Sequence, residues 1–430
     1  MRTVKWNAFL SGLCVTAVVL GLTAASAHAD VTIERGASIL AFPKVLANGS
    51  ADTVIQITNL SNNMVHARCF YVNARLRNPN EPEGPFNQPI WQETDFTIWL
   101  TKQQPTHWRV STGRQVNPLD HCFTLENSID AEECENAGID PGAVPPVPKD
   151  FVGELKCVEV DESETPVGGN HLKGEATVKN SDGDVAKYNG IGFEATDLAG
   201  ETDNTLLLDL PKGATDGGQY SACPNRLLLN HIAEGATDPA VLALGRGGVC
   251  MLDEVTSQQA NFDHVQACSS DDDCGGDYVC DGGPEVSVSG NQLSLRSATL
   301  TDLTLVPCQE DFEEQKGGVV TVKFTIYNEF ETPFSASTTV ACWKNFFLHQ
   351  VDSRNNPENS VFSAGVLGST AAMTVIEPVD GEGGVIGVAG VVRADRDGQI
   401  ARTLHNIHIE GDRFTATDGA VVDKVILSEP

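Results

Sequence analysis

The stretch TVIQITNLSNNMVHARCFYV, residues 53–72, decides the fold class of this chain. Two runs rich in Val, Ile, Thr and aromatic residues flank the polar segment 59–63, whose Asn and Ser residues favour a turn. A strand, a polar turn and a strand in this order predict a β-hairpin. Similar short runs separated by Gly, Asn and Asp continue along the chain, whereas no convincing amphipathic helix is found. The sequence therefore predicts an all-β protein.

A second hairpin is predicted over Asp95–Ser111. The register that pairs Leu100 with Trp108 and Ile98 with Val110 keeps one face of this hairpin apolar. A slip of one residue would place apolar side chains opposite charged ones, because side chains alternate between the two faces of a strand. The pattern therefore predicts both the hairpin and its register.

The order of these motifs, ILAFPKV, then NGSADTVIQITNLSNNMVHARCFYV, then DFTIWLTKQQPTHWRVS, resembles bacterial immunoglobulin-like modules of the CARDB and Hydin type. Those modules start with an apolar-Phe-Pro run, continue with a strand that ends in Thr-Asn, and later contain a strand, a Pro/Gln turn and a strand. The resemblance runs from Val31 to Thr112, and the Pro- and Asn-rich stretch 73–93 departs from it. It implies an extracellular β-sandwich used as a spacer or binding module, and it implies no chemistry.

The first 29 residues are typical of a secretory signal. Arg2 and Lys5 form a basic start, an apolar run follows over Ala8–Leu22, and Ala27 and Ala29 supply the small residues that signal peptidase accepts. The alternative, a transmembrane anchor, is disfavoured because the run is short and contains polar residues. We expect cleavage between Ala29 and Asp30 and secretion to the periplasm or the cell exterior.

The cysteine content agrees with export. One of the twelve cysteines lies in the predicted signal, which leaves eleven, and the absence of any Cys-x-x-Cys motif disfavours zinc and redox sites. The odd number leaves at least one thiol free or intermolecular. Cys122 and Cys134 are expected to form a local pair. The candidate disulfide residues are Cys122, Cys134, Cys268, Cys274, Cys280, Cys308 and Cys342.

Two Cys-rich segments divide the chain into tandem immunoglobulin-like antiparallel β-sandwich regions. In the C-terminal part, Val319–Asn328 and Ser335–Trp343 predict a hairpin that repeats the pattern of residues 53–72. The predicted division is a signal peptide at 1–29, a sandwich at 30–112, a Cys- and Pro-rich connection at 113–150, a β-rich region at 151–265, an acidic Cys-rich insertion at 266–284 and a C-terminal sandwich at 285–430.

The charge excludes several function classes. The chain carries 28 Lys and Arg against 59 Asp and Glu, a net charge of −31. Such a surface repels nucleic-acid phosphates and anionic lipid, so we expect no nucleic-acid partner and no membrane-surface role. No segment after the signal is long enough to span a bilayer.

The sequence also lacks the familiar catalytic motifs: Gly-x-Ser-x-Gly, Ser-x-x-Lys, His-Glu-x-x-His and the phosphate-binding loop are all absent. We therefore expect a secreted, non-catalytic binding or structural protein that recognises carbohydrate or a cell-surface protein. The alternative is a secreted hydrolase that acts on polysaccharide through an unrecognised site.

Two acidic turns are candidate calcium sites. Asn180, Asp182 and Asp184 place oxygen-bearing side chains at alternate positions, and Asp395 and Asp397 form a second Asp-x-Asp-Gly turn. Neither completes the twelve-residue EF-hand pattern. The alternative is a solvated turn, since Asn, Asp and Gly favour turns in any case. Ca²⁺ is the cofactor hypothesis that the sequence offers.

Aromatic residues form the candidate glycan platform. The register of the second predicted hairpin places Trp99 opposite Arg109 on its outer face, where a cation–π contact is within reach. Trp91 lies close by in the sequence. Secreted β-sandwiches stack sugar rings on exposed Trp, so Trp91, Trp99 and Arg109 are predicted to bind carbohydrate. The alternative is that the stretch 73–93 covers Trp99.

Overall fold

The computed structural model describes fourteen stretches of the chain in detail, and the account below is limited to them. They are residues 31–79, 87–116, 139–181, 183–196, 204–210, 218–234, 248–252, 267–268, 278–281, 299–352, 359–379, 382–394, 400–410 and 422–429. Their strands confirm the all-β class, and the ladders between named strands are antiparallel apart from one parallel pair, β17 with β26.

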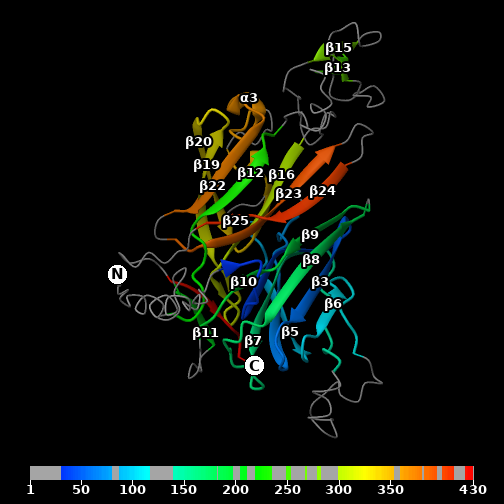
Figure 1. Ribbon diagram of the computed structural model, residues 1–430, viewed down its shortest axis with the longest axis vertical. Helices are drawn as coiled ribbons and strands as arrows, with labels where there is room; N and C mark the ends of the chain where they lie inside the picture. Colours follow the sequence, from blue (N-terminus) through cyan, green and yellow to red (C-terminus); the bar gives the residue numbers. More distant parts are fainter. Residues whose placement is uncertain are drawn as a thin grey trace, which may run out of the picture.

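The first sandwich has two layers (Figure 1). One layer runs β5-β4-β7-β2, with β10 and β1 beyond the start of β2, and the other runs β6-β3-β8-β9. The strands are β1 (Val31–Thr32), β2 (Ile39–Asn48), β3 (Ala51–Asn59), β4 (Val65–Asn73), β5 (Gln92–Leu100), β6 (Pro105–Arg109), β7 (Phe151–Val160), β8 (Leu172–Asn180), β9 (Val185–Asn189) and β10 (Ile191–Phe193).

Both predicted N-terminal hairpins were wrong. β3 pairs with β6 and β8, and β4 pairs with β5 and β7, so the turn 59–63 crosses from one layer to the other. β5 and β6 are likewise in different layers, since Leu100 pairs with Val65 and Trp108 with Ile55. Leu100 and Trp108 still share one hydrophobic core. Alternation showed which face is buried, but a hairpin and a crossing between layers bury that face equally well.

The side chain of Asn59 explains why the first crossing is rich in Asn. Asn59 is fully buried, and its amide nitrogen donates to the carbonyls of Asn63, Leu100 and Thr101 at 2.6, 3.1 and 3.0 Å. These bonds join the turn after β3 to the connection between β5 and β6. One amide therefore fixes both crossings at the same end of the sandwich.

The first sandwich extends beyond the boundary expected at residue 112. β7 lies between β4 and β2 in the same layer, and β8 and β9 extend the other layer. Residues 151–193 therefore belong with 31–109 instead of starting a separate region. A buried disulfide joins neighbouring strands of this layer through Cys69 and Cys157, which are direct register partners.

The C-terminal sandwich packs two sheets around a second core. One sheet runs β20-β19-β22-β12-β25 and the other β21-β16-β23-β24. The hairpin predicted in this part is confirmed by the pairing of β19 with β20. The elements are β12 (Leu227–Ile232), β16 (Thr299–Pro307), β19 (Val319–Asn328), β20 (Pro333–Ala341), β21 (Lys344–Phe347), η4 (Leu348–Gln350), α3 (Ala364–Leu367), β22 (Ala371–Pro378), β23 (Val385–Ala394), β24 (Ile400–Asn406) and β25 (His408–Ile409).

Two small sheets complete the described strands. One contains β11 (Thr205–Leu208), β17 (Glu310–Asp311), β18 (Lys316–Gly317) and β26 (Asp423–Ile426), and the other contains β13 (Gly248–Leu252), β14 (Ala267–Cys268) and β15 (Tyr278–Asp281). The first of them contributes to the core that covers the outer face of the layer β5-β4-β7-β2. β4 and β7 in that layer are therefore covered on both faces, which is why every residue of β4 is buried, whereas β5 at the edge keeps exposed residues.

The cysteines fall in several of these elements. A second disulfide joins Cys223 to Cys308 and ties the segment before β12 to the end of β16. Cys268 lies in β14 and Cys280 in β15, whereas the expected pair Cys122 and Cys134, together with Cys274, lies outside the described residues. No helix among the described residues has the length and apolarity that a membrane crossing requires.

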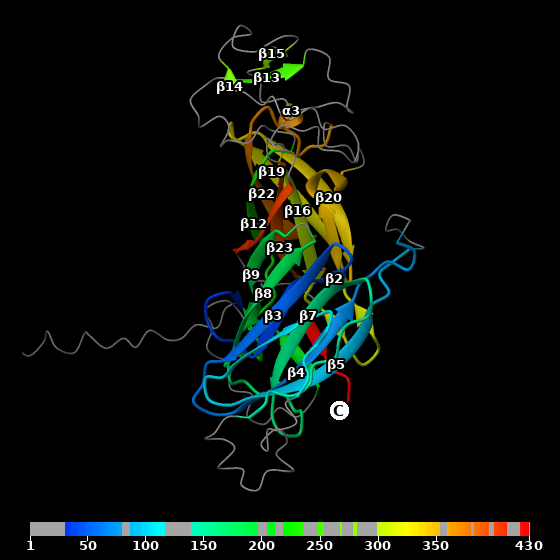
Figure 2. The ribbon, with the colours of Figure 1, turned by 90° about the vertical axis from the view of Figure 1, so that its right-hand side faces the viewer.

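The two sandwiches meet along β9 and β24, which lie side by side (Figure 1). The amide of Asn406 donates to the carbonyl of Asn189 at 2.7 Å, and the backbone N–H of Asn189 donates back to Asn406 at 2.9 Å. In the view turned by 90°, β2 runs toward β16 and β23 and β3 runs back from them (Figure 2). This junction positions the site described next.

Candidate functional site

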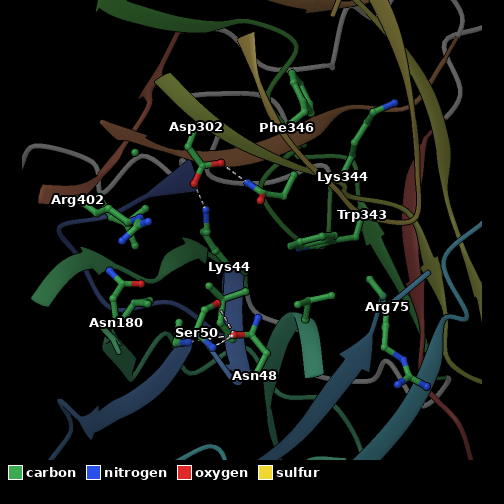
Figure 3. A pocket seen from close by; sticks show the side chains of 18 of the residues that line it. Lys44, Asn48, Ser50, Arg75, Asn180, Asp302, Trp343, Lys344, Phe346 and Arg402 are labelled. Atoms are coloured by element: carbon green, nitrogen blue, oxygen red, sulfur yellow. Dashed lines mark hydrogen bonds and ion pairs between the residues drawn. The ribbon is translucent and has the colours of Figure 1, made fainter. Parts of the chain in front are cut away.

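A cavity lined by residues of both sandwiches lies where they meet. Its volume is about 890 Å³. The first sandwich contributes the end of β2, the β2–β3 and β8–β9 turns and the segment 74–79, and the C-terminal sandwich contributes β16, β21, β23 and β24. Figure 3 shows Arg402 and Asn180 toward one end, Lys44 and Trp343 in the middle and Arg75 toward the other end. The lining therefore comes from both sandwiches, with Arg75 and Arg402 on opposite sides of Lys44 and Trp343 in this view.

Lys44 reaches the cavity because β2 is irregular there. The register of β2 against β7 shifts between Phe42 and Val45, around Pro43, which cannot donate to a ladder. The hydroxyl of Tyr188 satisfies the displaced backbone: it accepts from the N–H of Lys44 at 3.1 Å and donates to its carbonyl at 2.7 Å. Burial raises the pKa of Tyr188, so this phenol stays neutral.

Two residues of the C-terminal sandwich hold the bulge of β2. The ammonium of Lys44 forms an ion pair with Asp302 of β16, and the indole N–H of Trp343 donates to the carbonyl of Pro43 at 2.7 Å. Asp302 also accepts from the amide of Asn345. Figure 3 shows the Lys44 ammonium pointing to the Asp302 carboxylate, with the Trp343 indole to one side. The middle of the cavity is thus a fixed wall of one indole, one ion pair and one amide.

The β2–β3 turn adds further hydrogen-bonding groups. The side-chain oxygen of Asn48 accepts from the backbone N–H groups of Ser50 and Ala51, each at 2.9 Å, and from the hydroxyl of Ser50 at 2.8 Å. This Asx turn uses the Asn48 carbonyl oxygen and leaves the amide N–H groups of that side chain for another acceptor. The turn therefore presents a polar edge to the cavity.

The lining carries an excess of positive charge, in contrast to the whole chain. Lys44, Arg75, Lys344 and Arg402 face only two acidic lining residues, Asp150 and Asp302, among the residues that the structure describes. Across the whole chain, acidic residues outnumber Lys and Arg by 59 to 28. The cavity is therefore a local reversal of the charge of the protein.

The predicted glycan platform is not brought together. Trp91 is buried against Phe312, with 5.6 Å between the ring centroids. Trp99 stacks on His66, with 3.8 Å between the ring centroids, and packs beside Ile139. Arg109 lies in the other layer. The predicted contact between Trp99 and Arg109 was wrong because it depended on the hairpin register.

The Arg109 guanidinium has an acidic neighbour instead of an indole. Its nitrogen lies 3.5 Å from a carboxylate oxygen of Asp52, and its backbone pairs with Val54 of β3. Both side chains are partly exposed to solvent, so this ion pair contributes little to stability. Arg109 therefore belongs to the outer surface of the layer that contains β3.

The candidate calcium turns are described only in part. Asn180 and Asp184 close the turn between β8 and β9, and the carboxylate of Asp184 accepts the backbone N–H of Arg402 at 3.0 Å. Asp182, Asp395 and Asp397 lie outside the described residues. Within the described part of the chain, no group of three His, Cys, Asp or Glu is arranged to hold a metal ion. Asp184 therefore joins the two sandwiches at the end of the cavity.

A buried charged cluster lies behind this site. Lys156 of β7 forms an ion pair with Glu310 of β17, and both side chains are almost fully buried. Glu154, two residues before Lys156, is also fully buried. Burial, reinforced by the neighbouring Glu310 carboxylate, raises the pKa of Glu154 well above its ordinary value. The surroundings of Glu154 therefore favour its neutral form.

Replacing Glu154 by Gln is expected to stabilise the protein at alkaline pH. A carboxyl with a raised pKa in the folded state loses stability as the pH rises above its unfolded pKa, because only the unfolded state then releases the proton. Gln keeps the shape of the protonated acid and cannot ionise. Urea unfolding at pH 8 should show a gain of about 1 kcal/mol or more, and the gain should vanish near pH 4.5. The exposed replacement Glu175→Gln is the control, and a gain of equal size there would contradict the explanation.

A second buried pair is the strongest chemical motif outside the cavity. The imidazole of His349 lies 2.8 Å from a carboxylate oxygen of Glu234, and both residues are buried in the C-terminal sandwich. The backbone N–H of His349 also donates to the same oxygen at 3.0 Å. These contacts fix η4 against the end of β12. Neither residue lines the cavity, so the pair is best explained as a structural contact.

Comparisons with known proteins do not assign the chain to a family. No protein-family model matches the chain, and no curated protein matches it. Among solved structures, the apo form of a Pleurotus ostreatus lectin is 11% identical, covers 92% of this chain and 93% of its own, and has a TM-score of 0.15. The structure of broad bean stain virus is 12% identical, covers 97% and 100%, and has a TM-score of 0.13. At these TM-scores neither match assigns a fold or a ligand.

Proposed function

We propose that the protein is a secreted, non-catalytic carbohydrate-binding protein whose binding site is the cavity between the two sandwiches. The observation that carries the proposal is the composition of the middle of this cavity. The Trp343 indole, the amides of Asn48 and Asn345 and the Lys44–Asp302 ion pair all line it. Sugars are recognised by this combination, in which planar groups and amides contact the ring and the hydroxyl groups.

The lining also supports a binding role over the hydrolase alternative. The described lining residues include no His and no Cys. Of their two carboxylates, Asp302 is already engaged by Lys44 and Asn345, so it is poorly placed to donate or accept a proton from a substrate. We therefore expect no release of reducing sugar from any polysaccharide that the protein binds.

The test is a glycan array followed by calorimetric titration of the exported chain. Thr403 is exposed on β24 and lines the cavity, so Thr403→Trp should fill it and weaken binding at least about tenfold. Ala401→Trp is the matched control, because Ala401 is exposed on the same face of β24 but does not line the cavity. Trp99→Ala tests the site predicted from the sequence.

Three results would overturn the proposal. They are the absence of binding to any glycan, equal loss in both Trp variants, and loss on Trp99→Ala with full binding by Thr403→Trp. The last result would show that carbohydrate binds at Trp99 on β5 and not in the cavity. Release of reducing sugar that Thr403→Trp abolishes would support the hydrolase alternative.

A further inference from the structure

The charge of the lining residues indicates which class of ligand this cavity binds. Arg75 lines one end, beyond Trp343, and Arg402 lines the other (Figure 3). Lys44 lies between them, and Lys344 adds a further positive charge on the C-terminal wall. Asp302 pairs with Lys44, so the positive excess comes from Arg75, Lys344 and Arg402 against Asp150. In a chain with a net charge of −31, this local excess favours anionic ligands.

The guanidinium of Arg75 has hydrogen-bonding capacity that the described residues do not use. Its Nε–H is buried and has no hydrogen-bond partner among the described residues. A buried donor without a partner is costly, and a ligand oxygen would remove that cost. No ion pair of Arg75 is found in the described part of the chain. The guanidinium offers a planar fork of donors that matches a carboxylate.

The backbone around Arg75 is held in place before any ligand binds. Its carbonyl accepts from the N–H of Ile90 at 3.0 Å, and the next residue, Leu76, forms a β-bridge with Pro89. Asn78 and Asn87 then exchange two hydrogen bonds of 2.9 Å. The segment that carries Arg75 is thus fixed against 87–90, and little order has to be gained on binding.

β2 and β16 offer no free strand edge to an extended peptide, whereas β21 and β24, which also line the cavity, are the edge strands of their sheet. A peptide gains affinity by pairing with a free strand edge. β2 is paired with β7 on one side and with β10 and β3 on the other, and β16 is paired with β21 and β23. Recognition there depends on side chains, which suits a chain of hydroxyl groups.

From these observations we propose that the cavity binds a linear acidic oligosaccharide, one that carries carboxylates as uronic acid units do, and that Arg75 pairs with one of the carboxylates. The inference rests on the proposed function, because it names the class of carbohydrate that the same cavity takes. Arg75 sets the preference for acidic over neutral sugar, and the middle of the cavity contacts the ring and hydroxyl groups.

The experiment compares two ligands that differ only in charge. The exported chain is titrated calorimetrically with hexagalacturonic acid and with its fully methyl-esterified form. The acid should bind at least about tenfold more tightly at about 50 mM salt, and the ratio should shrink in about 0.5 M salt. Arg75→Gln should lower affinity for the acid about tenfold and leave the ester unchanged. Arg77→Gln, at an exposed position outside the cavity, should change neither.

Each remaining outcome has a definite meaning. Equal binding of acid and ester would overturn this inference and leave the proposed function intact. Binding of neutral glycans on the array with no binding of either hexamer would do the same. No binding of any carbohydrate would overturn both. Tighter binding of hexaglutamate than of the acidic sugar would show that the anionic ligand is a peptide.

Discussion

Replacing Lys156 by Met is expected to lower the free energy of unfolding by about 3–5 kcal/mol. Lys156 and Glu310 have side chains that are 2% and 1% exposed, so solvent cannot take over the role of the missing ammonium. Removing one partner of a buried pair leaves the other charge uncompensated, which is far more costly than the pair itself. Met keeps most of the aliphatic volume of Lys, so the loss reports the charge and not a cavity.

The pH dependence of this loss identifies its cause. Without Lys156, the carboxyl of Glu154 loses the ammonium that lowers its pKa and keeps the Glu310 carboxylate as a neighbour, so the folded-state pKa of Glu154 rises further. Carboxyls with a raised pKa lose stability as the pH rises above their unfolded value of about 4.3. The deficit of Lys156→Met should therefore be larger at pH 8 than at pH 5 in urea unfolding curves.

A matched surface pair supplies the control. Lys187 forms an ion pair with Glu175, and these side chains are 50% and 38% exposed. Lys187→Met should cost less than about 1 kcal/mol, because water screens the pair and solvates Glu175 when Lys187 is removed. Equal losses in the two variants, or a Lys156→Met deficit that does not change with pH, would contradict a buried, uncompensated charge.

The sequence predicted the strands and their buried faces better than it predicted which strands are neighbours. Regular alternation of apolar residues, such as Ile98 and Leu100 in β5, predicted a strand and its buried face correctly. Alternation cannot show which strand lies next to which, because any partner that buries the same face satisfies it. The hairpins expected at 53–72 and 95–111 failed for this reason, whereas the one at β19 and β20 succeeded because its two strands are true neighbours.

Short sequence patterns could predict neither the buried charged residues nor the cavity. Lys156 and Glu154 alternate with Leu155 and look like the solvent face of a half-buried strand, but β7 is covered on both faces. The cavity is lined by residues as far apart in the sequence as Lys44, Asp302 and Arg402, so no short sequence motif predicts it. The one local signal was Pro43 inside a β-rich run, since Pro in a strand indicates a bulge or an edge.

Removing the disulfide between Cys69 and Cys157 is expected to cost about 4–5 kcal/mol of unfolding free energy. The bond closes a loop with a sequence separation of 88, and the loss of chain entropy in the unfolded state grows with the logarithm of loop length. Both cysteines are fully buried register partners on β4 and β7. The double variant Cys69→Ala/Cys157→Ala adds only a small core void, and its denaturant midpoint against wild type is the measurement.

The second disulfide makes this prediction sharper. Cys223 and Cys308 are 85 residues apart, so a purely entropic effect gives Cys223→Ala/Cys308→Ala nearly the same loss. The two bonds differ in what they hold. The first joins adjacent strands that pair along their whole length, and the second ties the irregular segment before β12 to the end of β16, where the chain has fewer other constraints. A larger loss of unfolding free energy in Cys223→Ala/Cys308→Ala would therefore show that this bond also stabilises the folded state. If Cys69→Ala/Cys157→Ala is as stable as wild type, β4 and β7 hold together without their bond.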